Sequence, residues 1–187
     1  MLLLDIKELL KYIHINKLFN GRNMNTNIRL ILKAKEILRN TTPLPFDCGT
    51  LCENLCCKGS EDVGMLLFPD EEHLYINSGN FEIIDGKIIV CKGHCDRDER
   101  PLSCMLYPLF PVISEESGKT RIRLIPDIRG SIICPLTAEE NLVTRDFERA
   151  VRRAVRCLIV SPEHRRFIDN ISEELSEIYT LRNLLIK

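Results

Sequence analysis

Cysteine placement constrains this chain more than any other feature of its sequence. Eight of the nine cysteines lie between residues 48 and 134. They form one run of Cys48, Cys52, Cys56 and Cys57, a second group of Cys91, Cys95 and Cys104, and the separate Cys134. Thiolates are the strongest soft ligands that a protein offers, and closely spaced cysteines hold Zn²⁺ or an iron–sulfur cluster. The spacing therefore predicts that these eight thiols are metal ligands.

Two other interpretations of the cysteines are weaker. A disulfide framework needs an oxidising compartment, but the N-terminal segment MLLLDIKELLKYI lacks the basic start and the cleavage site of a secretory signal. An odd number of cysteines would also leave one thiol unpaired. Ordinary buried cysteines would be scattered along the chain, whereas these are bunched.

The composition is ordinary for a globular protein, with 44% hydrophobic and 28% charged residues. The formal net charge is −1, so we expect no general attraction to nucleic acid or to a membrane surface. No apolar run reaches the roughly 18–20 residues that a membrane-spanning helix needs. We therefore expect a cytoplasmic protein whose partner is an unidentified protein or small molecule.

Periodicity and turn signals predict one α+β domain over the whole chain, residues 1–187. Residues 1–40 are expected to form N-terminal helices, residues 46–136 a Cys-rich metal-binding core with a small antiparallel β region, and residues 137–187 the C-terminal helices. Met24 is an alternative start, which would make residues 1–23 a leader. Apolar residues recur at helical spacing in the N-terminal part at Ile28, Ile31, Ala34 and Leu38.

Two hairpins are expected in the Cys-rich core. Asp85-Gly86 joins the apolar segments FEII and KIIV, and this dipeptide between β-branched runs is the strongest short hairpin signal. A second hairpin is expected to join LFPVI and TRIRLI through the polar loop SEESGK. Pro101 and Pro108 are expected to hold the chain extended around Cys104.

Capping signals predict two C-terminal helices. Thr137-x-x-Glu140 is a capping box that predicts a helix reaching about Leu158. Ser161 followed by Pro162 predicts the start of the next helix. The apolar stripe of this last helix is expected to pack in the core, and it comprises Phe167, Ile171, Leu175, Ile178, Leu181, Leu184 and Leu185. Cys157, in the helix before it, is expected to be a buried thiol and not a ligand.

The geometry of the first cysteine run depends on its local structure. In a helix, Cys48, Cys52 and Cys56 would share one face; in a loop, the same spacing lets the chain wrap a metal. Adjacent residues usually project in different directions, so Cys56 and Cys57 need not face the same centre: they are expected to serve two sites, or one to ligate while the other supports the site. A neighbouring arginine, Arg97 or Arg100, is a candidate for offsetting the thiolate charge.

The motif residues resemble those of the YkgJ-type family of zinc- or iron-chelating proteins. They are Cys48, Cys52, Cys56 and Cys57, followed by Arg100, Pro101, Cys104, Tyr107 and Pro108. The resemblance covers residues 46–111 and implies metal chelation; Met105, where the family usually has Arg, and the x3 spacing of the first run are departures. The stretch CGTLCENLCCKG is also similar to the cysteine region of flagellin lysine N-methylases, which are longer proteins.

Two functions follow from these patterns. The first is a metal-binding protein that holds an iron–sulfur cluster or zinc, and the alternative is an iron–sulfur-dependent enzyme similar to a protein lysine N-methylase. The chain has no Gly-rich nucleotide loop and no length for a further catalytic domain, which disfavours the enzyme. Many thiols without an obligatory histidine favour an iron–sulfur cluster over zinc. No catalytic residue is predicted.

Overall fold

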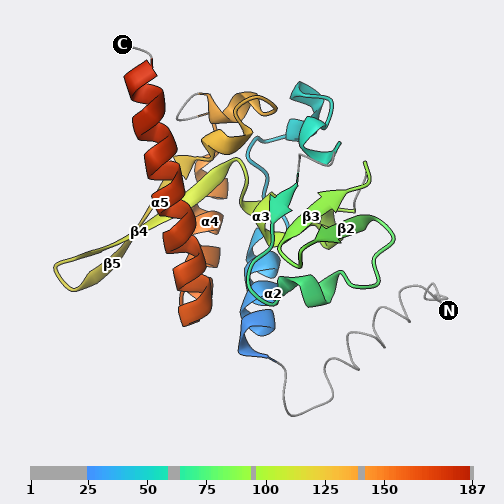
Figure 1. Cartoon of the computed structure of the whole chain (residues 1–187), viewed down its shortest axis with the longest axis horizontal. Coiled ribbons are helices and arrows are strands. Elements are labelled where there is room, and N and C mark those ends of the chain that lie inside the picture. Colours follow the sequence, from blue (N-terminus) through green and yellow to red (C-terminus); the bar gives the residue numbers. More distant parts are fainter. Residues whose placement is uncertain (1–24, 59–63, 94–95, 139–141, 186–187) are drawn as a thin grey trace.

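The computed structural model describes residues 25–58, 64–93, 96–138 and 142–185, and within these ranges the fold is α+β, as predicted (Figure 1). The elements are α2 (Thr26–Leu38), β1 (Met65–Leu66), β2 (Phe81–Ile84), β3 (Ile88–Cys91), α3 (Leu102–Leu106), β4 (Leu109–Glu116), β5 (Lys119–Pro126), α4 (Arg145–Leu158) and α5 (Pro162–Leu185). The expectations for residues 1–23 and for Met24 lie outside the described residues.

Both expected hairpins are present, and each belongs to a separate antiparallel sheet. The first sheet has the order β1–β3–β2 and the second is the β4–β5 pair. Asp85 and Gly86 have φ of +51° and +67°, which is the left-handed turn that such a dipeptide favours. Ser117 and Gly118 form the second turn with φ of +51° and +72°, so β4 and β5 extend further into the polar loop than predicted.

The helices pack the two sheets around one main core. Figure 1 shows α2 and α3 between the sheets, with α5 lying across the β4–β5 pair. The hydroxyl of Ser172 donates to the carbonyl of Pro111 at 3.1 Å, and the hydroxyl of Tyr179 donates to that of Pro126 at 2.8 Å. The core combines residues from α2, the Cys-rich middle and both C-terminal helices, among them Ile31, Leu38, Leu102, Leu106, Phe147, Val151, Leu158 and Ile168.

Two expectations about local structure are wrong, one about a helix start and one about the chain around Cys104. Thr137 does not cap a long helix, because α4 begins only at Arg145, with the hydroxyl of Thr144 accepting from the backbone N–H of Phe147 at 3.3 Å. Thr137 instead ends a 3₁₀ turn, where its hydroxyl donates to the carbonyl of Cys134 at 2.7 Å. The chain around Cys104 is not extended either, since it forms α3. Glu140 lies outside the described residues.

The start of α5 is confirmed, but its apolar stripe is buried over only part of its length. The hydroxyl of Ser161 accepts from the backbone N–H of His164 at 3.3 Å. Ile171 and Leu175 are buried, whereas Leu181 and Leu184 are 61% and 65% exposed. The helix is therefore longer than the core that it covers. Among the described residues, no helix combines the length and apolar character that crossing a bilayer requires.

Cys157 on α4 is half-buried, where full burial was expected. Its thiol faces the carbonyl of Leu30 on α2 at 3.9 Å. It does not line the cavity that five of the other cysteines share. Cys157 is therefore a suitable internal control for experiments on the clustered thiols.

A buried histidine makes the stability of the α5 end depend on pH. His164 is fully buried, its Nε2 lies 3.2 Å from the carbonyl of Pro69, and burial lowers the pKa of His164. A lowered pKa in the folded state means that the unfolded chain binds the proton more readily, so stability is full above the unfolded pKa near 6.5 and falls as the pH drops below it. We expect a loss of up to about 1.4 kcal/mol for each pH unit below that value.

Chemical denaturation at pH 7.5 and at pH 5.5 measures this loss in the unfolding free energy. The His164→Gln variant keeps an N–H donor for Pro69 but does not titrate, so its stability should fall less between the two pH values. If wild type and variant lose the same free energy, the histidine is not the group responsible.

Candidate metal centre

The first cysteine run folds as two short 3₁₀ turns, Cys48–Leu51 and Leu55–Cys57. Glu53 and Asn54 lie between them in the left-handed region, with φ of +51° and +57°. This reversal rules out the continuous helix and leaves the alternative in which the chain wraps. A Cβ at Gly49 would lie 1.9 Å from Oδ1 of Asn54, so a larger residue there would displace the Asn54 side chain that packs on the first turn.

The other described cysteines come from three separate elements. Cys91 ends β3, Cys104 lies on α3, and Cys134 directly precedes the 3₁₀ turn Pro135–Thr137. Of the described cysteines, Cys91 alone is in a strand, so helical turns present most of the thiols instead of the expected β region. Cys95 lies outside the described residues.

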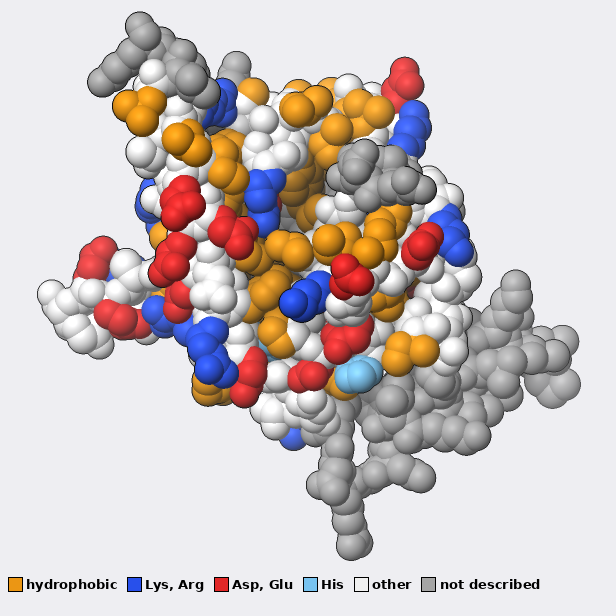
Figure 2. Space-filling view, in the orientation of Figure 1, with side chains coloured by type: hydrophobic (Ala, Val, Ile, Leu, Met, Phe, Trp, Pro, Cys, Tyr) orange, Lys and Arg blue, Asp and Glu red, His pale blue; other side chains and the backbone are white. Residues whose placement is uncertain are grey.

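Tertiary packing brings five of these thiols to one cavity of about 500 Å³. They are Cys48, Cys56, Cys57, Cys91 and Cys104. Cys52 and Cys134 lie near enough for their charges to raise the pKa of Cys48. Figure 2 shows hydrophobic side chains, cysteines included, gathered around a hollow in the upper half of the molecule, where Figure 1 places the thiol-bearing turns. Thiols of both cysteine groups therefore line the same cavity.

Three thiols of the cavity, those of Cys48, Cys56 and Cys104, have raised pKa values. Burial raises the pKa of Cys104 to about 12 and also raises the pKa of Cys48. A hydrogen bond with Cys57, together with burial, raises the pKa of Cys56. The guanidinium of Arg100 acts in the opposite direction on both Cys48 and Cys104. Arg100 is thus the arginine placed to offset thiolate charge, as the sequence suggested for Arg97 or Arg100.

A fully buried carboxylate, Glu71, holds α3 in place behind Cys104. Its Oε1 accepts from the backbone N–H of Leu102 at 2.7 Å, and its Oε2 accepts from that of Phe68 at 3.1 Å. Leu102 begins α3, so Glu71 satisfies an N–H that the helix itself leaves without a partner. Burial raises the pKa of Glu71, and the nearby charge of Lys35 opposes that rise.

Lys35 on α2 completes this support from the other side. Its Nζ donates to the hydroxyl of Tyr75 at 2.8 Å and lies 5.2 Å from the centre of the Tyr75 ring. Burial lowers the pKa of Lys35, while Glu71 and Cys104 oppose that effect. Neither Glu71 nor Lys35 was predicted from the sequence. The sequence pattern could have predicted a buried Lys35, because it falls on the same helix face as Ile31 and Leu38. Nothing in the sequence distinguishes Glu71 from the acidic residues beside it.

The position of Tyr107, which also lines the cavity, depends on a glycine. The hydroxyl of Tyr107 donates to the carbonyl of Gly130 at 3.1 Å, and burial, followed by the charge of Cys134, raises the pKa of Tyr107. A Cβ at Gly130 would lie 2.1 Å from that hydroxyl oxygen. Tyr107 can therefore lie against this turn only because residue 130 has no side chain.

We expect Gly130→Ala to destabilise the protein by about 1–3 kcal/mol, as overpacking does, because Tyr107 must move. Gly79→Ala is the matched control, since no atom lies within 4 Å of a Cβ built there. Thermal or chemical denaturation of the three proteins measures the difference. Equal stability of the two variants would show that Tyr107 moves at no cost.

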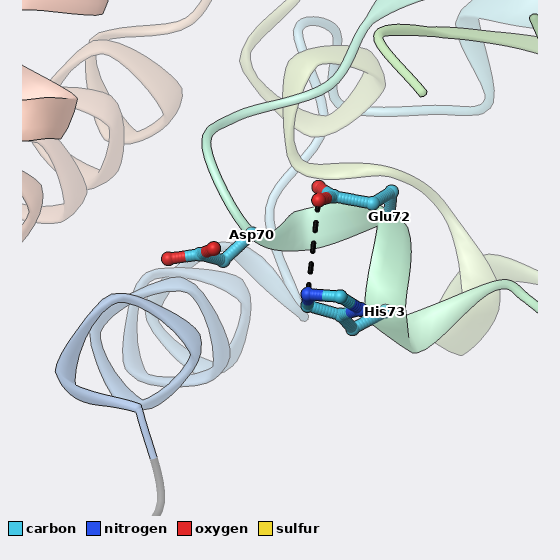
Figure 3. Close-up of side chains that lie close together, drawn as sticks. All are labelled: Asp70, Glu72 and His73. Atoms are coloured by element: carbon cyan, nitrogen blue, oxygen red, sulfur yellow. Dashed lines mark ion pairs between the residues drawn. The ribbon is translucent and has the colours of Figure 1, made fainter. Parts of the chain in front are cut away.

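A second group of metal-ligand side chains lies away from the cavity and is weaker. Asp70, Glu72 and His73 place ligand atoms within 4.8 Å of one another (Figure 3), and no other group of three or more described His, Cys, Asp or Glu residues does so. Asp70 already accepts from the side-chain amides of Asn25 and Asn27, each at 2.7 Å. The carboxylate of Asp70 thus holds the start of α2 in place. We therefore assign no metal to the group of Asp70, Glu72 and His73.

Comparison with protein-family models, with curated proteins and with solved structures gives no match to this chain.

Proposed function

We propose that this protein binds a soft metal centre through its clustered cysteines, with an iron–sulfur cluster favoured over zinc. The observation that carries the proposal is the cavity lined by five thiols from separate segments, Cys48, Cys56, Cys57, Cys91 and Cys104. Cys52 and Cys134 lie close to this set, and the sequence adds Cys95. Thiolates from a well-packed fold are the ligands of both zinc and iron–sulfur sites.

The described sulfur atoms do not form a preassembled zinc site. Four thiolates around one zinc, each about 2.3 Å from the metal, must lie within roughly 4 Å of one another. Among the described residues, no three thiols come within 4.8 Å of one another. A cluster spreads its ligands over several iron atoms, so it accepts sulfurs that stand further apart.

The charges around the cavity also fit an anionic centre. Burial raises the pKa of Cys48 and of Cys104, and the charge of Arg100 opposes that rise, which helps the thiolate form that a metal requires. Both carboxylate oxygens of Glu71 accept hydrogen bonds from backbone N–H groups, so Glu71 is not placed to act as a metal ligand. A reducing compartment such as the cytoplasm would keep the thiols available, and we propose that location with the function.

The resemblance to the YkgJ-type family agrees with this proposal. The residues that carry it include Cys56 and Cys57, together with Cys104, all of which line the cavity. Tyr107 of the same motif also lines the cavity. The lysine N-methylase-like alternative gains no specific observation from the described residues and stays a prediction.

Anaerobic purification followed by metal analysis, sulfide analysis and an absorption spectrum tests the proposal. Iron with acid-labile sulfide and a broad visible absorption band would support the cluster, whereas zinc without colour would support the alternative metal. Chain without metal, even after reconstitution with iron and sulfide or with zinc, would contradict the proposal.

A further inference from the structure

The cavity that contains the thiols extends well beyond them. Besides the thiols, apolar side chains from six different elements line it: Leu38, Leu66, Leu106, Phe110, Phe147 and Ile171. We call the part of the cavity lined by these residues the apolar chamber. Its wall residues belong to the main core or pack against it. A zinc ion or an iron–sulfur cluster bound by the cysteines lies at their sulfur atoms, and the side chains of the apolar chamber offer it no ligand.

The apolar chamber is a poor site for either empty space or water. An empty apolar cavity costs stability roughly in proportion to its volume, and water in such a cavity finds few polar partners. The volume of about 500 Å³ lies in the range of pockets that hold small organic molecules. Ile132, which also lines the cavity, is 95% exposed, so the cavity reaches the surface at that residue and a molecule can enter.

Polar groups in the wall are already bound to the protein itself. Asp127 and Arg129 form a two-point ion pair at 2.9 and 2.6 Å. The hydroxyl of Ser103 donates to the carbonyl of Leu66, and Arg97 donates to the carbonyls of Arg39 and Thr41. A ligand that needed these groups would have to break existing hydrogen bonds. Apolar contact is therefore the recognition that the chamber offers.

We propose that the apolar chamber binds an uncharged, hydrocarbon-rich organic molecule, of the size of a few fused rings, beside the metal centre. The inference rests on the proposed function only in placing the metal on the thiol side of the cavity. Burial of apolar ligand surface supplies the affinity, and the thiol-bearing wall places one end of the molecule next to the metal.

Binding of 1-aminoanthracene, a neutral three-ring fluorophore that brightens in apolar surroundings, tests the inference. The chain has no Trp, so the probe is excited without competing indole emission. We expect saturable binding of one probe per chain to the metal-loaded protein. Met65→Trp should weaken it about tenfold or more, because Met65 lines the cavity and the larger ring would occupy the apolar chamber.

Ile122→Trp is the matched control, because Ile122 on β5 packs against the main core without lining the cavity. It should leave probe affinity within about twofold of wild type. Met105→Trp, from α3, provides a second filling variant if Met65→Trp does not fold by circular dichroism.

Metal content is measured on the same samples, so that the two proposals fail separately. Full metal loading with no saturable probe binding, or equal binding by wild type and both filling variants, would overturn the inference and leave the proposed function intact. Chamber-dependent probe binding to a chain that never takes up metal would support the inference and contradict the proposed function.

Discussion

Cys56→Ser should lose most of its bound metal, while Cys157→Ser should keep the wild-type content. Cys56 lines the shared cavity and is hydrogen-bonded to Cys57. Cys157 lies on α4, with its thiol facing the carbonyl of Leu30. Even groups that only orient a metal ligand change affinity by about 10–100-fold when replaced, so we expect loss of a ligand to weaken binding by at least about tenfold.

Metal per chain and visible absorption, measured after anaerobic purification of both variants, provide the comparison. Serine is close to cysteine in size, so the circular dichroism spectrum of each variant, to which α4 and α5 contribute, should match that of wild type. A matching spectrum would exclude unfolding as the cause. A third variant, Cys104→Ser, extends the test to the second cysteine group. Equal metal loss from Cys56→Ser and Cys157→Ser would refute the assignment of the ligands.

Local signals predicted the elements that depend on local conformation. Asp85-Gly86 has the positive φ values that its turn requires, and these two residues alone were enough to place the hairpin. The stripe Ile28, Ile31 and Leu38 likewise predicted the buried face of α2. Such features need no knowledge of the rest of the chain.

Features that depend on tertiary partners were not predicted. Four-residue spacing of Cys48, Cys52 and Cys56 fits a helix and a loop equally, and the left-handed conformation of Glu53 and Asn54 decides between them. The apolar period of α5 continues to Leu184, which the core no longer reaches. Periodicity reports which face of a helix is apolar, but not where its partner ends.

The candidate site, too, was predicted only in part. Residue type and spacing identified the cysteines, because thiol chemistry is visible in the sequence. The supports behind them, Glu71 and Lys35, act through a backbone N–H of α3 and through Tyr75. Those partners are far apart in the sequence, so only the folded chain shows that a buried carboxylate positions the helix that carries Cys104.

Removal of the metal should loosen the cysteine segments and leave the C-terminal helices folded. The first run consists of two 3₁₀ turns whose apolar residues Leu51 and Leu55 are exposed, so this segment buries little apolar surface to offset its chain entropy. By contrast, α4 buries Val151, Val155 and Leu158 in the main core. Ligation and folding are coupled in thiolate sites of this kind.

Hydrogen exchange on metal-loaded and metal-free protein measures the difference. We expect amides in residues 46–58 to exchange about tenfold faster or more without metal, those in residues 96–108 to follow, and those of α4 to keep their protection. Residues 96–108 should respond less than 46–58, because Glu71 holds the first turn of α3 whether or not metal is bound. Unchanged protection in both segments after verified metal loss would mean that the fold is organised without the thiols, because the exchange of these amides reports directly on the free energy of local opening.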